Sequence, residues 1–286
     1  MVSLGIQDLD IMGGEPFLLP WMPSFLHAAI KDGIMVNIST NGSFPEVMKE
    51  LRGLSSGKIN IGISLEGSTA EAHNCLTSSA NFDKAVASIA SLVSRKLDPI
   101  VKSVVHRQTM ADMQDIISFL KQMGVQRCYL IHMDQITWGI NDQMSAISYP
   151  AFLNFFQKIK MTNPGIEINK VNASCFERQT LPEGMRCAGS VRKLSVMPDG
   201  TVYPCSLFQH APEFRLGNLF TDPFSTLWEN PKLAFFRNFS TNKCPRTDCS
   251  NHSSCTGGCP AHALFHGYDM QDMDIRCRKH QSHRRS

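Results

Sequence analysis

The chain has 286 residues, 42% of them apolar, which is enough for one large α/β domain and a smaller second domain. Its formal net charge of +3 is too small to favour nucleic acid or an anionic membrane as a partner. No apolar run reaches the roughly 18 residues that span a membrane, and residues 1–8 do not resemble the start of a signal peptide. We therefore expect a cytoplasmic protein, in which clustered cysteines are more often metal ligands than disulfides.

Short β-rich runs alternate with helical patterns between residues 7 and 161, which predicts right-handed βαβ units around a parallel sheet. Five strands are too few to close an eight-stranded barrel, so the sheet is expected to be open or to have lost members. The expected strands cover Asp8–Met12, Met35–Thr40, Asn60–Leu65, Ile100–Val105 and Arg127–His132. The expected helices lie near Trp21–Lys31, Phe44–Leu54, Asn81–Arg95 and Ala111–Met123.

Three of these strands run into small and polar residues at their carboxyl ends. The runs are Gly13-Gly14-Glu15-Pro16, Thr40-Asn41-Gly42 and Ser64-Leu65-Glu66-Gly67. Any one of them alone predicts no more than a turn. Carboxyl ends of parallel strands share one edge of a sheet, and enzymes of this architecture bind ligands there. Three such runs in succession therefore predict a ligand site.

The cysteines are distributed unevenly. Cys75 and Cys128 are isolated, and the other eight fall in the last 112 residues. Seven of those eight form the pattern Cys187-x12-Gly200-x4-Cys205, then Cys244-x4-Cys249-x5-Cys255-x3-Cys259, then Cys277. A zinc site is the alternative, but zinc sites of this kind use close C-x2-C pairs, which the array lacks. The spacing favours iron–sulfur clusters.

The Gly-Gly-Glu-Pro run resembles the hallmark of the radical SAM superfamily, where backbone and Glu hold the amino group of S-adenosylmethionine. The runs at the ends of the next two strands also resemble the family pattern, although the family more often has Asp at the position of Glu66. The resemblance implies an α/β fold over residues 1–165, a partial (β/α) radical SAM barrel lacking its first strand. It also implies which residues bind the cofactor: the methionine moiety contacts Gly13, Gly14 and Glu15, and the ribose lies near Ser64 and Asn41.

The cysteine array resembles the SPASM domain, which carries two auxiliary 4Fe–4S clusters, and it covers residues 185–280. One mismatch is the spacing of four rather than two residues between Cys244 and Cys249. The resemblance implies that cluster I is held by Cys187, Cys205 and Cys259, with Cys175 as the candidate for a fourth ligand. Cluster II would be held by Cys244, Cys249, Cys255 and Cys277.

Two departures from the radical SAM pattern concern activity. The sequence has no C-x3-C-x2-C run, which in the family ligates the catalytic cluster that cleaves S-adenosylmethionine to a 5′-deoxyadenosyl radical. It begins at what corresponds to the second strand, so we expect an N-terminally truncated member whose third cluster this chain does not ligate. Thr77 stands where relatives have an Arg that pairs with the methionine carboxylate.

The resemblance implies a radical SAM/SPASM oxidoreductase that modifies a peptide or protein side chain, with an electron donor such as ferredoxin or flavodoxin. Tetrapyrrole side-chain modification is an alternative. Sulfatase maturation is disfavoured because Ser206, rather than Asp, follows Cys205. Because the catalytic motif is absent, a non-catalytic iron–sulfur partner that relays electrons or binds a peptide is the other alternative. The sequence leaves open whether the chain is an enzyme.

Overall fold

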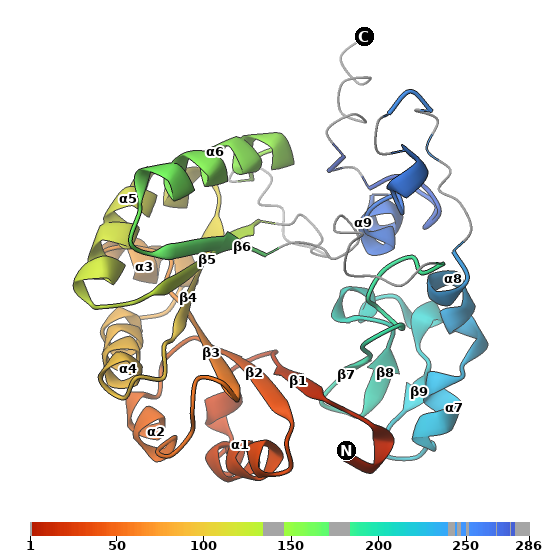
Figure 1. Cartoon of the computed structure of the whole chain (residues 1–286), viewed down its shortest axis with the longest axis horizontal. Coiled ribbons are helices and arrows are strands. Elements are labelled where there is room, and N and C mark those ends of the chain that lie inside the picture. Colours follow the sequence, from red (N-terminus) through yellow and green to blue (C-terminus); the bar gives the residue numbers. More distant parts are fainter. Residues whose placement is uncertain are drawn as a thin grey trace. The chain divides into compact units, whose positions relative to one another are not determined.

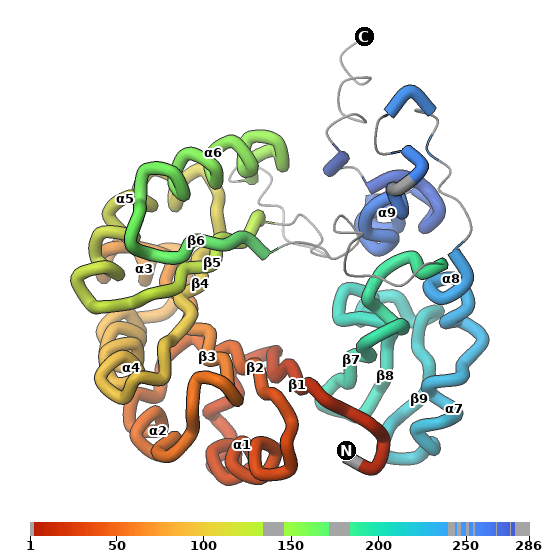
Figure 2. Tube along the Cα trace, viewed as in Figure 1, coloured from red at the N-terminus to blue at the C-terminus, as the bar shows by residue number. Residues whose placement is uncertain are grey.

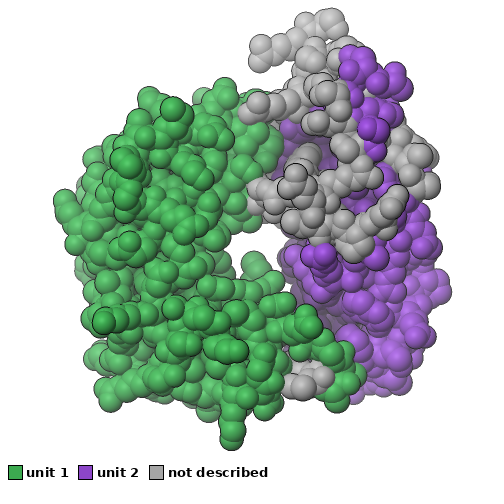
Figure 3. Space-filling model, viewed as in Figure 1, with its two compact units in different colours: residues 1–133, 143–171 green, residues 134–142, 172–286 purple. Residues whose placement is uncertain are grey.

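The structure is a computed structural model that describes residues 2–133, 146–171, 184–239, 244, 247–249, 252–266, 268–274 and 276–277. The chain divides into two compact units, coloured green and purple in Figure 3. Unit 1 comprises residues 1–133 and 143–171, and unit 2 comprises residues 134–142 and 172–286.

Unit 1 contains a six-stranded sheet in which every strand pairs in parallel with its neighbours in the sequence (Figure 1). Sequential order with parallel pairing is the winding of a (β/α) barrel rather than of a doubly wound sheet. The strands are β1 Asp8–Ile11, β2 Met35–Thr40, β3 Ile59–Ser64, β4 Ile100–Val105, β5 Arg127–His132 and β6 Glu167–Lys170.

The helices of unit 1 cover one face of this sheet (Figure 1). Aliphatic side chains that alternate along the strands pack against apolar helix faces, and both form one buried core. The helices are α1 Met22–Lys31, α2 Pro45–Glu50, α3 Ala70–Thr77, α4 Phe82–Ser94, α5 Arg107–Gln122 and α6 Tyr149–Thr162. Single 3-10 turns lie at Val2–Leu4 and Pro16–Leu18.

The strand residues that alternate with this core carry polar side chains. The Asn37 side-chain amide donates to the Asp10 carboxylate over 2.7 Å, and the Asn60 side-chain amide donates to the side-chain Oδ1 of Asn37 over 2.8 Å. These residues are paired in register across β1, β2 and β3, so they form a row on the face opposite the helices. Unit 1 therefore has an apolar outer layer and a polar inner face.

Unit 2 is mostly loop between short elements, as the chain trace in Figure 2 shows. Its antiparallel sheet consists of β7 Ser195–Val196, β8 Thr201–Tyr203 and β9 Gly217–Asn218. Its α-helices are α7 Phe224–Trp228, α8 Ala234–Arg237 and α9 Pro260–Phe265, and 3-10 turns lie at Ser206–Phe208, Pro212–Phe214, Pro231–Leu233 and His252–Ser254. Among the residues of unit 2 that the structure describes, the apolar ones form two small clusters rather than one core.

The expected α/β fold with a partial barrel followed by a loop-rich domain is confirmed. The five expected strands are present with ends shifted by at most one residue, and in unit 2 a hairpin turns at Pro198–Gly200 between β7 and β8. Among the described residues of unit 1, the sequence reasoning missed α3, α6 and the short strand β6. In the part of the chain that the structure describes, no helix has the length and apolar character needed to cross a membrane.

Candidate functional site

The carboxylate of Glu15 ties together the loops that follow β1 and β2. Its Oε1 accepts hydrogen bonds from the Thr40 hydroxyl over 2.7 Å and from the Phe17 backbone N–H over 3.1 Å. Its Oε2 accepts from the backbone N–H of Asn41 over 2.7 Å. Glu15 is half-buried. Two of the runs singled out in the sequence, Gly-Gly-Glu-Pro and Thr-Asn-Gly, therefore meet at one side chain.

Gly13 and Gly14 leave open space beside this carboxylate. A Cβ atom built on either residue would have no described heavy atom within 4 Å, and both residues are exposed. Gly13 has φ +97°, a conformation that favours glycine. The backbone of this loop is thus accessible to a ligand, as the resemblance requires.

Helix α4 and Asn81, the residue before this helix, support the loop that follows β2. The Asn81 amide donates to the Asn41 carbonyl over 2.9 Å, and the buried Ser88 hydroxyl donates to the Gly42 carbonyl over 2.8 Å. Gly42 has φ +75°, and a Cβ there would lie 2.9 Å from the Ala85 Cα. Asn41 is exposed in front of this support.

The third run, at the end of β3, is organised by a buried histidine. The His73 Nδ1 accepts from the Glu66 backbone N–H over 3.0 Å, and Nε2 lies 3.0 Å from the side-chain Oδ1 of Asn81. Burial lowers the pKa of His73, which favours the neutral ring. Ser64 is half-buried at the strand end, so the structure brings it to the same sheet edge as Glu15 and Asn41. The structure gives no direct contact of Ser64 with Glu15 or Asn41, and the role of Ser64 near the ribose stays a prediction.

Two ionisable groups near this edge of the sheet have shifted pKa values: Lys102, which the sequence analysis did not single out, and Glu66 of the third run. Lys102 donates from Nζ to the Ser39 hydroxyl over 2.7 Å and occupies the space over Gly62, where a Cβ would lie 2.7 Å from Nζ. Burial lowers the pKa of Lys102, and the charge of Asp10 opposes that shift. Glu66 accepts from the Val104 backbone N–H over 2.8 Å, and burial raises its pKa to about 7. A lysine within an otherwise apolar strand was the signal available in the sequence.

Thr77, which stands where relatives have an arginine, makes a hydrogen bond within its own helix. Its hydroxyl donates to the His73 carbonyl over 2.9 Å, within the last turn of α3. Ser78 follows in the left-handed conformation and ends the helix. Thr77 therefore supplies no charge toward the open edge of the sheet.

In unit 2, three of the predicted cluster ligands share one apolar cluster. Cys187, Cys205 and Cys259 pack together with Tyr203 and Phe208 in it. The pKa of the Cys187 thiol is raised to about 12, mainly by burial and in smaller part by the nearby Cys259 and Cys205 thiols. The trio is the set predicted to hold cluster I.

Gly189 lies between Cys187 and Cys205 and has no side chain, which allows the two cysteines to lie close to each other. A Cβ on Gly189 would lie 3.4 Å from the Cys187 sulfur and 3.4 Å from the Cys205 Cβ. The Leu207 backbone N–H points at the Cys205 sulfur over 3.4 Å. Backbone N–H groups directed at sulfur are what a thiolate-ligated cluster uses. Cys175 lies outside the described residues.

A second group forms around Cys255. Burial raises the pKa of the Cys255 thiol, and the thiols of Cys277 and Cys244 add to the shift. The Gly257 backbone N–H donates to the Cys255 sulfur over 3.2 Å. These three cysteines belong to the set predicted for cluster II. The fourth, Cys249, accepts at its backbone carbonyl from the His252 N–H over 2.8 Å.

Among the described residues, no three His, Cys, Asp or Glu side chains converge on the position of a single metal ion. In a 4Fe–4S cluster the cysteine ligands bind four different irons, so the ligand side chains are arranged differently from those around a single metal ion. What fits the clusters is the donor set: thiols in two groups, half-buried or buried, with backbone N–H groups directed at sulfur.

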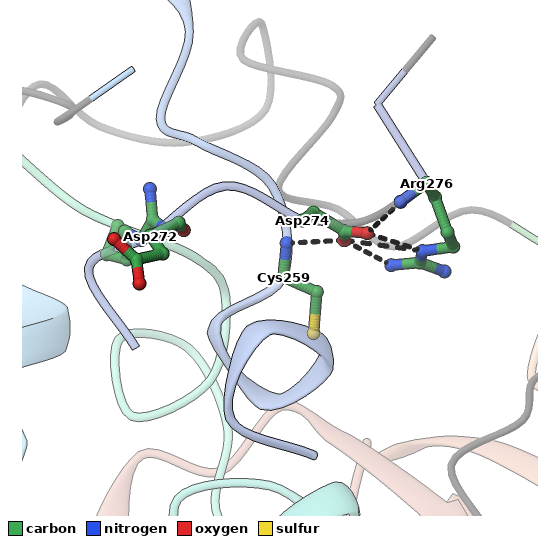
Figure 4. A network of polar contacts seen from close by, with 5 residues as sticks. Cys259, Asp272, Asp274 and Arg276 are labelled. Carbon is green, nitrogen blue, oxygen red and sulfur yellow. Dashed lines mark hydrogen bonds and ion pairs between the residues drawn. The ribbon is translucent and has the colours of Figure 1, made fainter. Parts of the chain in front are cut away.

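A buried carboxylate, Asp274, contacts both Cys259 and Arg276 (Figure 4). Its Oδ2 accepts from the Cys259 backbone N–H over 2.8 Å and from the Arg276 Nη2 over 2.7 Å. Its own carbonyl accepts from the Cys277 N–H over 2.9 Å. Burial alone would raise the pKa of Asp274, but the hydrogen bonds and charge of Arg276 lower it. The Asp-x-Arg-Cys run that carries this network was not recognised in the sequence.

Two family models match the chain. One, described as the radical SAM superfamily, matches residues 1–120, and the other, SPASM, described as an iron–sulfur cluster-binding domain, matches residues 187–260. Together they match more than half of the chain.

Curated relatives match over nearly the whole chain. The mycofactocin maturase MftC of Mycobacterium tuberculosis is 25% identical, and the alignment covers 94% of this chain and 70% of the relative. An AdoMet-dependent heme synthase of Methanosarcina barkeri is 23% identical, with 97% and 84% covered. A PqqA peptide cyclase of Ruegeria pomeroyi is 22% identical, with 98% and 76% covered.

Among solved structures, that of Streptococcus suis SuiB bound to its precursor peptide SuiA matches with a TM-score of 0.76 and 14% identity. The match covers 95% of this chain and 65% of the SuiB chain, so this chain spans slightly less than two thirds of SuiB. At this identity the likeness shows a shared fold.

Proposed function

Because the chain belongs to the radical SAM superfamily and carries a SPASM iron–sulfur domain, we propose that it is a peptide maturase of this family. The cofactors of the family are S-adenosylmethionine and 4Fe–4S clusters. In this proposal the radical SAM core covers residues 1–165 and the SPASM domain covers residues 185–280. The substrate is a side chain of a peptide or protein.

The observation that carries the proposal is the anchoring of two strand-end loops on Glu15. The carboxylate is held by Thr40 and by the Asn41 N–H, and it lies beside the open backbone of Gly13 and Gly14. A carboxylate fixed beside exposed N–H groups suits a ligand that carries an ammonium and a carboxylate. Gly13, Gly14 and Glu15 are thus proposed to hold the methionine moiety, and Asn41 and Ser64 to lie near the ribose. When bound, S-adenosylmethionine supplies the hydrogen-abstracting radical of the family.

The cysteine groups support two auxiliary clusters. Cys187, Cys205 and Cys259 are proposed for cluster I, with Cys175 as its fourth ligand. The proposed ligands of cluster II are Cys244, Cys249, Cys255 and Cys277. The packing of the first three in one apolar cluster and the electrostatic coupling of Cys255 with Cys244 and Cys277 support this partition.

The relatives support the substrate class. A maturase, a peptide cyclase and a protein bound to its precursor peptide are among the matches, which favours a peptide over a tetrapyrrole even though a heme synthase also matches. We propose an electron donor such as ferredoxin or flavodoxin, and a reducing cytoplasm that keeps the thiols available for iron.

A second candidate function is favoured by Thr77. Its hydroxyl is used inside α3, so the position that relatives give to an arginine supplies no charge for the methionine carboxylate. This feature suits a non-catalytic iron–sulfur protein that relays electrons or binds a peptide.

Anaerobic reconstitution with iron and sulfide, followed by S-adenosylmethionine binding in equilibrium dialysis, tests the proposal. We expect about eight irons per chain from two clusters. Loss of one charge-assisted contact in Glu15→Gln should weaken binding about 10- to 100-fold. Glu46→Gln is the control, since Glu46 is an exposed carboxylate that pairs with Lys49 on α2. Equal affinity in wild type and Glu15→Gln contradicts the cofactor site, and zinc without iron contradicts the clusters.

The two candidate functions differ in turnover. A maturase releases 5′-deoxyadenosine when reduced with dithionite in the presence of S-adenosylmethionine. A non-catalytic partner holds its eight or so irons and releases none.

A further inference from the structure

Lys102 places an ammonium group on the inner face of the unit 1 sheet, opposite the helices (Figure 1). Its neighbours along β4, Val101 and Ser103, have 0% exposure on the helix-covered side, so the alternation of the strand directs Lys102 to the other face. The side chain is half-buried there. Lysine is rarely withdrawn from water without a partner, so this position needs an explanation.

The neighbouring strands determine where the ammonium lies. A Cβ atom on Gly62 of β3 would be 2.7 Å from the Lys102 Nζ, 3.1 Å from its Cδ and closer still to its Cε. The lysine side chain therefore crosses the bare backbone of Gly62, and its Nζ donates to the Ser39 hydroxyl on β2 over 2.7 Å. A larger residue at position 62 would displace it.

The ammonium has hydrogen-bonding capacity that the described residues do not use. Of its three N–H donors, one is accounted for by Ser39, and no described carboxylate forms an ion pair with it. Burial lowers the pKa of Lys102, and the charge of Asp10 opposes that shift without reaching ion-pair distance. Arg127 on β5 differs, because its guanidinium pairs with Asp98 at 2.7 Å. A half-buried cation without a counter-ion favours the binding of an anion.

The side chains beside Lys102 offer hydroxyl groups to such an anion. Ser64 on β3 and Tyr129 on β5 are the register partners of Lys102, and paired residues of parallel strands project to the same face. Both are half-buried. Together with Ser39 they form a row with one cation, three hydroxyls and no acidic group. A carboxylate is the ligand that this row suits.

The ammonium is separate from the proposed anchor of S-adenosylmethionine. Glu15 bonds to the Thr40 hydroxyl, and Thr40 is in phase with the buried core residues of β2. Ser39 alternates with Thr40, so the Glu15 anchor belongs to the edge of the sheet and the Lys102 ammonium to its inner face. Ser64, which is proposed to lie near the ribose, is paired with Lys102. A molecule that reacts beside the ribose therefore reaches Lys102, and that molecule is the substrate.

We propose that Lys102 binds a carboxylate of the peptide substrate and so selects an acidic side chain or a free C-terminus close to the reacting residue. Both sources present the same carboxylate chemistry to the ammonium. The inference rests on the proposed function, because it takes the substrate to be a peptide that lies over the inner face. Lys102 contacts the substrate and sets specificity, and it takes no part in the bond changes.

Competitive retention of peptides on the reconstituted full chain, with S-adenosylmethionine present, tests the proposal. The probes are three pools of short peptides, random in residues other than Asp and Glu. One pool has a central Glu and an amidated C-terminus, one has Gln in place of that Glu, and one has Gln and a free C-terminus. Mass spectrometry of the retained peptides should show at least about tenfold enrichment of an acidic pool over the neutral pool. The enriched pool identifies the source of the carboxylate.

Lys102→Met removes the ammonium and should abolish this enrichment. Lys84→Met is the matched control, since Lys84 is an exposed lysine on α4 of the same unit, and it should keep the enrichment. Gly62→Ala keeps the charge but obstructs the path of the Lys102 side chain, so it should also lose the enrichment. Urea unfolding shows whether each variant is folded, and Gly62→Ala decides if Lys102→Met is not.

The other outcomes overturn the proposal. They are equal retention of all pools by the wild type, enrichment that persists in Lys102→Met, and enrichment that is lost equally in Lys84→Met, which would indicate general attraction by lysines. Weaker binding of S-adenosylmethionine to Lys102→Met in equilibrium dialysis would assign the ammonium to the methionine carboxylate instead. Wild type that binds S-adenosylmethionine without selecting acidic peptides refutes this inference alone, whereas wild type that binds neither the cofactor nor iron refutes the proposed function.

Discussion

Asp274→Ala removes a buried carboxylate that holds the Cys259 and Cys277 segments together. Asp274 has 0% exposure and Arg276 has 8%, and their charged groups are 2.7 Å apart. Breaking a buried ion pair by deleting one partner costs about 3–5 kcal/mol, because the remaining charge loses its compensation. The Cys259 N–H loses its acceptor as well, so we expect the upper part of this range. The loss should persist at every pH above 3.8, since the pKa of Asp274 is lowered from that ordinary value and the carboxylate stays ionised.

Urea unfolding of the reconstituted protein, followed by the visible absorbance of the clusters, measures this change as a lower midpoint. Iron content before unfolding shows whether the variant still assembles both clusters. Asp269→Asn is the control, because Asp269 is exposed in the same segment and accepts from the Gln271 N–H over 2.8 Å. The control should change stability by no more than about 0.5 kcal/mol. A loss below about 1 kcal/mol in Asp274→Ala, with full iron, would refute the reasoning.

Three further predictions concern other parts of the chain. Gly42→Ala should destabilise unit 1 by about 1–3 kcal/mol in urea unfolding, because φ is +75° and the Ala85 backbone blocks a Cβ, whereas the open Gly57→Ala should be neutral. The pKa of His73 is lowered in the folded chain, so the unfolded chain binds the His73 proton more tightly and the stability present above pH 6.5 should fall on acidification. In unfolding curves measured from about pH 7.5 to about pH 5.5, His73→Asn should make the free energy of unfolding depend less on pH. Cys75 is exposed and belongs to neither cysteine group, so Cys75→Ser should leave the iron content of the reconstituted chain unchanged; a loss of iron would implicate it as a ligand.

Strand positions in unit 1 could be predicted from the sequence because each strand is a short apolar run bounded by turn residues. β6 was missed since its residues, Glu167–Lys170, are mainly polar and only Ile168 enters the core. Helix α3 has one buried side chain, His73, and the contacts of His73 are tertiary. Patterns of burial thus missed two elements that are held mainly by specific polar contacts. They also missed α6, although α6 contributes Phe152, Phe156 and Ile159 to the core.

The same distinction applies to the sites. Glu15 was predictable because loop residues at successive strand ends must share an edge of a parallel sheet. Lys102 and Asp274 were not, since their partners lie 63 and 15 residues away, in Ser39 and Cys259, and only the folded chain brings them together. For the cysteines, spacing indicated an iron–sulfur array, but the partition came from the family resemblance. The structure supports it for Cys187, Cys205 and Cys259 and for Cys255 with its two neighbours.

The two units are stabilised in different ways, and this difference indicates what metal would do for unit 2. Unit 1 buries a continuous aliphatic core between its helices and sheet. Unit 2 has two small apolar clusters, and one of them includes Cys259 among its buried members with Cys187 and Cys205 packed against it. If these three cysteines ligate a cluster as proposed, this core contains its own metal ligands. We then expect iron binding and folding to be coupled in unit 2, because the thiolates pack fully only when metal neutralises them.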